Sequence, residues 1–232
     1  PQGRLQPAIL CRLLQEAAVA HANNLEVGVQ LLINHGVAWV LTRLRLDMDS
    51  WPGAGEELVV TTWPEAASKL FTERRFRLTD ATGRSIGAAT TLWLMIDLEQ
   101  RRAIRFPAYV ADRLRRHDLG SRPARLPELA APETMDRQLA FTVRRTDLDL
   151  AGHVNKTSYI EWAVEAVPDE IWDGCDLARL DVQFISECHL GQTILSGCRQ
   201  KETDDGVEVS HQILREDDGA ETARAVTLWR NR

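Results

Sequence analysis

The feature that most constrains the fold of this chain is an internal repeat with a constant offset of 136 residues, the separation between Gly83 and Gly219. Thr-Leu-Trp at residues 91–93 recurs at residues 227–229, and the turn glycine Gly55 has its counterpart in Gly191. A shared tripeptide alone is weak, but a triplet and two glycines in one register indicate duplication. The sequence therefore predicts two copies of one structural unit.

The first copy has the pattern of one helix followed by four strands. In residues 8–24, apolar side chains such as Leu10, Leu14 and Ala18 recur at helical spacing, which predicts a helix with one apolar face. Strands are expected at residues 38–47, 57–63, 71–79 and 85–98, separated by turn residues. The helix begins close to residue 1, so the first strand of this copy is expected to lie upstream of the sequence.

The second copy repeats this order with a strand before the helix. We expect that strand at residues 138–145, the helix at about 155–167, and further strands at residues 176–186, 193–202, 208–215 and 222–230. One long helix on an antiparallel sheet, twice over, is an α+β architecture. Four prolines without an apolar period mark a linker between the copies. The predicted domains are residues 1–106 and 138–232, with the linker at 107–137.

Composition excludes several classes of protein. A net charge of -6 argues against a nucleic-acid binder. No apolar run approaches the roughly 18 residues that a bilayer span needs. The four cysteines lack metal-ligand spacing and are interpreted as reduced thiols of a cytoplasmic protein.

We expect neither a metal nor an organic cofactor. The oligomeric state is left open, and a homodimer is among the states that the sequence allows.

The run with the most chemistry is Thr-Asp-Leu-Asp-Leu-Ala-Gly-His-Val-Asn at residues 146–155. It lies between a predicted strand and a predicted helix, so Asp149 and His153 share one tight loop. The N–H groups at a helix start favour a developing anion, which suits ester or thioester hydrolysis. A purely structural reading is also open, in which Asp149 stabilises a turn, Asn155 caps the helix and His153 points outward.

This run, with Tyr159 and Trp162 after it, resembles the active-site segment of plant and bacterial acyl-acyl-carrier-protein (acyl-ACP) thioesterases. Further similarity covers nearly the whole chain, at residues 14–18, 39–43, 61–64, 93, 96–97, 165–168 and 187–191. The resemblance implies a tandem (double) hot-dog fold, in which each sheet wraps a long helix. It also implies hydrolysis of fatty acyl-ACP in fatty acid biosynthesis, with the first half holding the acyl chain.

Position by position, the resemblance assigns catalysis to Asp149, His153 and Glu187. One carboxylate would activate a water, His153 would orient or donate, and N–H groups near Asn155 would face the oxyanion. Cys188 matches a cysteine proposed as the nucleophile in a papain-like scheme, but we favour the carboxylate because a distant Cys and His need shared geometry. The repeat position of Glu187 in the first copy is Trp51, so one active site per chain is expected.

Ala151 departs from the family pattern, which has Asn there. Hot-dog enzymes similar to 4-hydroxybenzoyl-CoA thioesterase have Asp-x-Ala-Gly at this place, which keeps an acyl-CoA thioesterase as an alternative. A non-catalytic acyl-binding module is a second alternative. We expect Asn155 or a backbone N–H to fill the role of the missing amide, so that Ala151→Asn is neutral or harmful.

Acyl carrier proteins are acidic, so docking on this acidic chain requires a local basic surface. The densest arginine clusters are Arg101, Arg102 and Arg105, followed by Arg113, Arg115 and Arg116. These six are the predicted docking residues. The alternative is that they are solvated side chains on a linker and a strand end.

Overall fold

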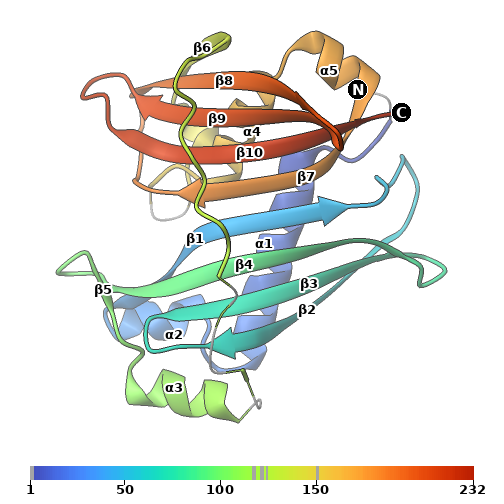
Figure 1. The fold of residues 1–232 in the computed structure, drawn as a ribbon. Coiled ribbons are helices and arrows are strands. Elements are labelled where there is room, and N and C mark those ends of the chain that lie inside the picture. Colours follow the sequence, from blue (N-terminus) through green and yellow to red (C-terminus); the bar gives the residue numbers. More distant parts are fainter. Residues whose placement is uncertain (1–2, 117–118, 121–122, 124, 150–151) are drawn as a thin grey trace. The chain divides into compact units, whose positions relative to one another are not determined.

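The computed structural model describes residues 3–116, 119–120, 123, 125–149 and 152–232. The chain forms two compact units, whose elements can be followed in Figure 1. The first consists of Pro1–Leu5, Leu10–Leu44 and Asp49–Pro127, and the second of Gln6–Ile9, Arg45–Met48 and Glu128–Arg232.

The first unit is built on strands in the order β2-β3-β4-β1, with the short β5 paired to β4. The β2-β3, β3-β4 and β4-β5 pairs are antiparallel. Its elements are, in chain order, α1 (Pro7–Asn24), α2 (Val29–Asn34), β1 (Val37–Met48), β2 (Leu58–Ala67), β3 (Phe71–Asp80), β4 (Ser85–Asp97), β5 (Arg102–Ile104) and α3 (Ala108–Arg115). The helix and the four long strands expected here are present with ends shifted by a few residues.

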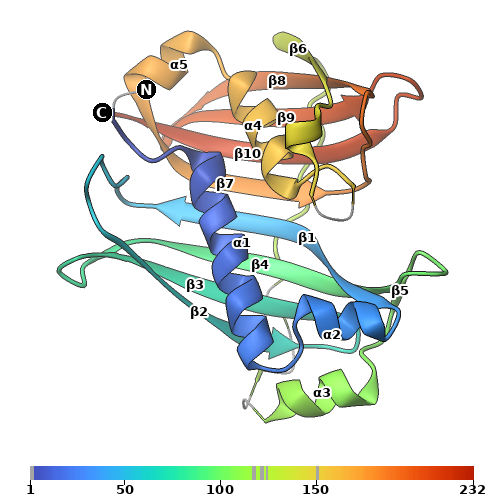
Figure 2. The ribbon, with the colours of Figure 1, turned by 180° about the vertical axis from the view of Figure 1, so that it is seen from behind.

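Helix α1 presents one apolar face to the strands, as its spacing predicts. Leu10, Leu14 and Ala18 follow one another at i, i+4 and i+8 and are buried. Figure 2 shows α1 lying across one face of the first unit's sheet. Hydrophobic burial along this stripe stabilises the helix, because most helical stability in proteins comes from the packing of an apolar face.

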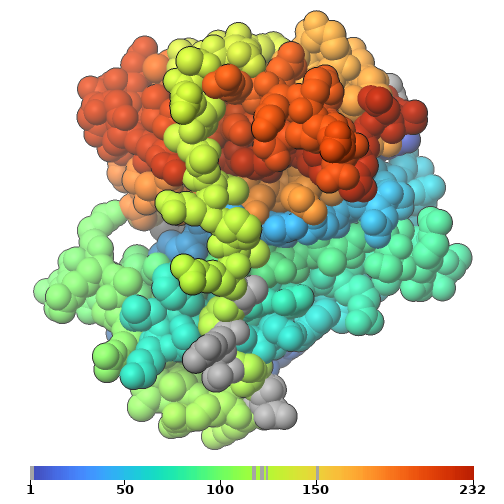
Figure 3. Space-filling view, viewed as in Figure 1, coloured from blue at the N-terminus to red at the C-terminus, as the bar shows by residue number. Residues whose placement is uncertain are grey.

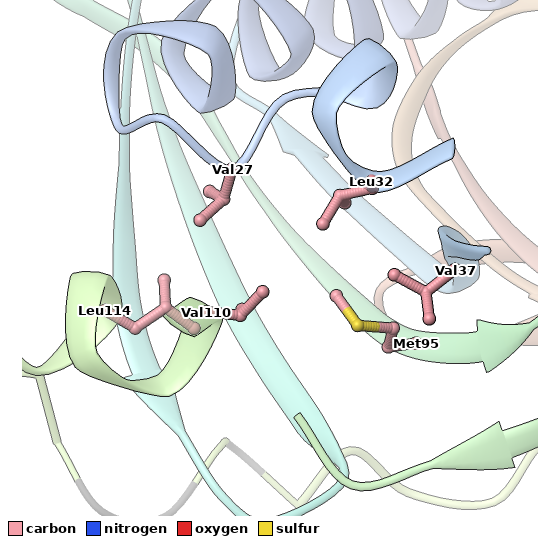
Figure 4. Close-up of a cluster of buried hydrophobic side chains, with 6 residues drawn as sticks. All are labelled: Val27, Leu32, Val37, Met95, Val110 and Leu114. Atoms are coloured by element: carbon pink, nitrogen blue, oxygen red, sulfur yellow. The ribbon is translucent and has the colours of Figure 1, made fainter. Parts of the chain in front are cut away.

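Helix α3 occupies the beginning of the stretch predicted to be linker. Two of its residues, Val110 and Leu114, are buried together with Val27, Leu32, Val37 and Met95. Figure 4 shows these six side chains converging from α2, α3, β1, β4 and the loop before α2. The expected linker therefore starts with a helix that belongs to the core of the first unit, because Val110 and Leu114 lie four residues apart and share the buried face of the helix.

The second unit has strands in the order β7-β10-β9-β8-β6. The neighbouring pairs in this order are antiparallel. Its elements are β6 (Arg137–Thr142), a 3-10 turn (Arg145–Asp147), α4 (Lys156–Glu165), α5 (Asp169–Gly174), β7 (Cys175–Phe184), β8 (Thr193–Thr203), β9 (Gly206–Arg215) and β10 (Glu221–Asn231). Strand β6 ends before its predicted limit of residue 145, because the Arg144 N–H turns to the Asp147 carboxylate at 2.7 Å and starts the 3-10 turn.

Helix α4 lies against this sheet (Figure 2). Its contacts with the strands are both apolar and polar. Tyr159, Ile160 and Ala163 are fully buried. Two side chains of β8 also donate to the helix's last carbonyls: Ser196 Oγ to Trp162 O at 2.8 Å and Cys198 Sγ to Ala166 O at 2.9 Å. These bonds satisfy carbonyls that a helix end leaves unpaired.

The internal repeat is visible in hydrogen bonds as well as in sequence. Trp93 Nε1 donates to Thr91 Oγ1 at 2.8 Å, and Trp229 Nε1 donates to Thr227 Oγ1 at the same distance. The N–H groups of residues 49 and 50 both donate to the carbonyl of residue 86, just as those of residues 185 and 186 donate to the carbonyl of residue 222. Gly55 and Gly191 both adopt a positive φ, 82° and 81°. Each of these features recurs at the predicted offset.

The segment that leads into β6 crosses one face of the second unit's strands. The Arg224 guanidinium donates to Leu129 O at 2.7 Å, and Leu129 is buried. In the space-filling view this yellow-green segment lies over the orange and red strands (Figure 3). None of the helices in the described part of the chain combines the length and apolar character that a bilayer span needs.

Candidate active site

The first aspartate of the Asp-Leu-Asp motif has a structural role. Asp147 is almost completely buried, and its carboxylate accepts from the Arg144 backbone N–H at 2.7 Å and from the Arg144 guanidinium at 2.9 Å. Its carbonyl accepts from Asn155 N at 2.8 Å, which closes the base of the loop. Asp147 therefore holds the two ends of the site loop together.

The second aspartate and the histidine lie in one tight turn. Asp149 N donates to His153 O at 2.8 Å, and His153 N donates to Asp149 Oδ1 at 3.2 Å. Gly152, at φ 79°, provides the left-handed backbone that the turn requires. One carboxylate oxygen of Asp149 thus orders the loop, as the structural reading expects. Ala151, the predicted departure from the family pattern, lies outside the described residues.

Glu187, far along the chain, is brought to this loop. His153 Nε2 lies 3.6 Å from Glu187 Oε2, and the two side chains are 31% and 34% exposed. Backbone pairing produces this meeting, because Val154 N donates to Cys188 O at 3.1 Å. The distance exceeds that of a hydrogen bond but places a carboxylate beside an imidazole at the surface, where water has access.

The backbone of Glu187 is held from the next strands. Arg215 Nη1 donates to Glu187 O at 2.9 Å, while the same guanidinium binds the Asp218 carboxylate at 2.6 and 2.9 Å. The ring of His189 lies 5.5 Å from that of His153. Glu187 is therefore carried on a fixed segment while its carboxylate faces the loop.

The start of α4 supplies fewer free donors than expected. Asn155 caps the helix, since its Oδ1 accepts from Thr157 N at 3.0 Å and from Thr157 Oγ1 at 2.9 Å. Ser158 N donates to Asn155 O at 3.0 Å, and Asn155 N is bound to Asp147. Three N–H groups near Asn155 are thus engaged within the protein rather than facing an oxyanion.

Cys188 follows Glu187 but lies in the interior. Its side chain is 0% exposed. Reactive cysteines are partly exposed and electropositive in their surroundings, whereas buried ones are inert. Burial also raises the pKa of the neighbouring Tyr159 phenol, with Cys188 adding to the effect. The geometry favours a packing role for this thiol.

Sequence reasoning missed Lys156, the first residue of α4. Its ammonium lies over the rings of Tyr159 and Phe184, at 5.4 and 5.1 Å from their centroids. Burial lowers the pKa of Lys156, while Glu187, Cys188 and Asp149 oppose that shift. A signal was available in the sequence, because a cation in the first turn of a helix opposes the helix dipole.

The six predicted docking arginines all belong to the first unit, on and around β5 and α3. Five are exposed, whereas Arg113 is partly buried and its Nε lies 3.2 Å from Glu26. Arg115 is paired with Asp112. Arg105 and Arg115 line a surface hollow of about 510 Å³ together with Lys69, a cation that the sequence analysis did not single out.

The first unit also contains an apolar pocket of about 100 Å³. Its lining includes Ala18 and Ala22 of α1, Trp39 of β1 and Trp93 of β4. Arg74 adds a polar contact at the wall, where its guanidinium binds His21 Nδ1 at 2.9 Å and Thr62 Oγ1 at 3.2 Å. Burial lowers the pKa of Arg74 to about 10.

Two protein-family models match the chain. The acyl-ACP thioesterase N-terminal domain matches residues 2–114, and the acyl-ACP thioesterase C-terminal domain matches residues 130–231. The chain belongs to the acyl-ACP thioesterase family. The loop with Asp149 and His153 and the segment with Glu187 both lie in the C-terminal domain of this family.

Two similar plant proteins are named as acyl carrier protein thioesterases. The chain is 27% identical to a chloroplastic palmitoyl-acyl carrier protein thioesterase of Gossypium hirsutum, over 94% of this chain and 57% of that protein. It is also 27% identical to the chloroplastic oleoyl-acyl carrier protein thioesterase 1 of Arabidopsis thaliana, over 96% of this chain and 70% of that protein. The chain therefore spans little more than half the length of the Gossypium relative.

A solved structure extends the similarity to the fold. The acyl-ACP thioesterase of Bacteroides thetaiotaomicron superposes with a TM-score of 0.84 at 25% identity, covering 98% of this chain and 91% of that chain. The predicted α+β tandem hot-dog fold is confirmed.

Proposed function

We propose that this acyl-ACP thioesterase family member hydrolyses fatty acyl-ACP to a free fatty acid and holo-ACP. The observation that carries the proposal is the His153–Glu187 pair, 3.6 Å between Nε2 and Oε2, in the C-terminal domain of the family. A carboxylate and an imidazole next to each other can move the protons of a hydrolysis without a covalent intermediate.

We assign the general base to Glu187. It takes a proton from a water whose oxygen attacks the thioester carbonyl carbon, and the carbon–sulfur bond then breaks. The proton passes to the leaving thiolate, with His153 orienting the carboxylate or donating. Asp149 is assigned the ordering of the loop, because its Oδ1 accepts from His153 N. Asn155 supports the site as the cap of α4, and Cys188 supports it by packing.

The test is a hydrolysis assay with one acyl chain on two carriers, ACP and coenzyme A, followed by a panel of acyl lengths on ACP. Higher kcat/KM on the ACP thioester supports the proposal. Preference for the CoA thioester would identify the acyl-CoA thioesterase alternative, which the Asp-Leu-Ala-Gly run at residues 149–152 keeps open. Hydrolysis of neither would leave an acyl-binding module.

Carrier docking is assigned to the six predicted arginines, two of which, Arg105 and Arg115, line the hollow of the first unit. Arg105, Arg115 and Lys69 supply positive charge at its wall, and Phe106, Leu114 and Leu119 supply apolar surface. An acidic carrier protein with its phosphate-bearing arm matches this combination. The acyl chain is assigned to the apolar pocket of the same unit, because that pocket is lined largely by apolar side chains.

We keep the cytoplasm as the proposed cellular setting, on the basis of the cysteines. All four are free and buried, which suits a reducing compartment such as the cytoplasm. Cell fractionation tests this assignment, since the plant relatives are named as chloroplastic. The homodimer stays a prediction, to be tested by light scattering.

A further inference from the structure

We propose that the apolar pocket of the first unit binds an aliphatic carboxylate, whose head group is held by the Arg74 guanidinium and whose hydrocarbon chain fills the pocket. The inference rests on the proposed function only where that function places hydrocarbon in this pocket. It adds a class of ligand that a plain acyl chain does not represent.

Arg74 of β3 is a buried cation at the wall of this pocket. The residue is 8% exposed and lines the pocket together with apolar side chains such as Ala18 and Ala22 of α1. Val27 and Leu114, which Figure 4 shows, belong to the same lining. Sites for small ligands typically combine an apolar lining with a few polar groups that fix the ligand's orientation. The pocket therefore has the composition of a site for a ligand with a hydrocarbon chain and a polar head.

The side-chain hydrogen bonds of Arg74 use one nitrogen and neutral partners. Nη1 donates to His21 Nδ1 at 2.9 Å and to Thr62 Oγ1 at 3.2 Å. A guanidinium can only donate, so His21 accepts through Nδ1 and its ring is uncharged. Burial lowers the pKa of Arg74 to about 10, which still leaves the group charged at neutral pH. The bonds within the protein therefore hold the guanidinium in place without neutralising it.

The neighbouring charges on β3 do not neutralise Arg74 either. Successive side chains of a strand point to opposite faces, so Glu73 and Arg75 lie on the other face from Arg74. These two residues pair with each other, with 2.7 Å between Arg75 Nε and Glu73 Oε1. Among the residues that the structure describes, no carboxylate pairs with Arg74. A buried charge is costly unless it is paired, so an anion that entered the pocket would be bound favourably.

The guanidinium nitrogens that remain are the pair that binds a carboxylate side-on. Nε and Nη2 make no hydrogen bond within the described part of the chain. Their N–H groups lie parallel on one edge of the planar group, and this fork matches the two oxygens of a carboxylate. A hydroxyl or a carbonyl has one oxygen and would fill only half of the edge. The free edge therefore favours a carboxylate over other oxygen-bearing head groups.

The test measures the binding of octanoate and of octanol to the purified chain by isothermal titration calorimetry. The two ligands have the same hydrocarbon length and differ in the head group. The wild type should bind octanoate about tenfold or more tightly than octanol, because only octanoate forms charged hydrogen bonds with Arg74. Arg74→Met should weaken octanoate binding by about tenfold or more and change octanol binding by less than about twofold. Arg74→Lys keeps the charge without the fork and should lie between the two.

The carboxylate comes from one of two sources, a free fatty acid or the far end of an acyl chain on its carrier. Octanoate that competes with acyl-ACP for the wild type but not for Arg74→Met identifies the free acid. Faster hydrolysis of an acyl-ACP with a terminal carboxylate than of a plain acyl-ACP of equal length, lost in Arg74→Met, identifies the acyl chain.

The control is Arg77→Met, which removes an exposed arginine of the same strand and should bind octanoate as the wild type does. Equal wild-type affinity for octanoate and octanol, or unchanged octanoate binding by Arg74→Met, would overturn the inference. If Arg74→Met does not fold, as judged by circular dichroism, the wild-type comparison and Arg74→Lys decide the matter. Calorimetry requires no turnover, so a chain that binds octanoate through Arg74 but hydrolyses no acyl-ACP would refute the proposed function alone.

Discussion

Acidification should destabilise the folded chain through His211. This side chain on β9 is 0% exposed. Its Nε2 lies 3.0 Å from Thr227 Oγ1, and its Nδ1 has no hydrogen-bond partner among the described residues. Burial lowers the pKa of His211 from 6.5 to about 3. The imidazole is therefore neutral in the folded chain at pH values where it becomes charged in the unfolded chain.

The sign and size of the effect follow from this difference. The unfolded state binds the proton more tightly, so the stability that His211 contributes is complete above pH 6.5 and is lost as the pH falls toward 3. Each pH unit within this window costs about 1.4 kcal/mol. The free energy of unfolding should thus fall by about 2 kcal/mol between pH 6.5 and pH 5, a large part of the typical total of about 5–15 kcal/mol.

The assay is urea unfolding of wild type and His211→Leu at pH 7.5, 6.5, 5.5 and 5. Leucine keeps the site apolar and cannot titrate, and Thr227 keeps its contacts to Trp229 Nε1 and Val209 O. Between pH 7.5 and 5 the wild type should lose about 2 kcal/mol more than the variant. His35→Gln, which removes an exposed histidine, serves as the control and should behave as wild type. Equal pH dependence in wild type and His211→Leu would refute the reasoning.

Three further predictions concern the site and its supports. Glu187→Gln should lower kcat by about 10² to 10⁴ with little change in stability, whereas Cys188→Ala should keep most of the activity; the reverse pattern in steady-state kinetics would make the cysteine the nucleophile. Replacing Arg105 and Arg115 together by Glu should raise KM for acyl-ACP and spare a small thioester, and equal loss on both substrates would exclude docking there. Asn155→Ala removes the cap of α4 and should cost about 0.5–2 kcal/mol in urea unfolding, against no cost if the cap is dispensable.

The long elements of both units could be predicted because their patterns are long. Residues such as Leu10, Leu14 and Ala18 repeat often enough to define a helix, and turn glycines such as Gly83 and Gly219 mark the strand ends. The elements that sequence reasoning missed, α2, α3, α5 and β5, have three to eight residues each. They are stabilised by packing against other parts of the chain, which a local pattern does not record.

The candidate site likewise has a part that the sequence predicts and a part that it does not. The loop from Asp149 to His153 is local, so its motif predicts it. Glu187 reaches that loop through the Val154–Cys188 backbone bond, a long-range pairing that only family resemblance could anticipate. The hydrogen bonds of the N–H groups around Asn155 depend on capping geometry. The cation–π contact of Lys156 depends on Phe184, which lies on another element. Neither follows from spacing alone.

The hydrogen bonds that recur in both copies also indicate where the sequence of such a chain can change. Both copies keep the Trp–Thr bond and the paired backbone donors, yet the residue that follows these donors is Trp51 in one copy and Glu187 in the other. The position after these donors therefore tolerates a bulky indole or a carboxylate without loss of the architecture. Duplication thus gives this chain a second copy of the same scaffold, in which this position can be substituted while the other copy keeps its own residue.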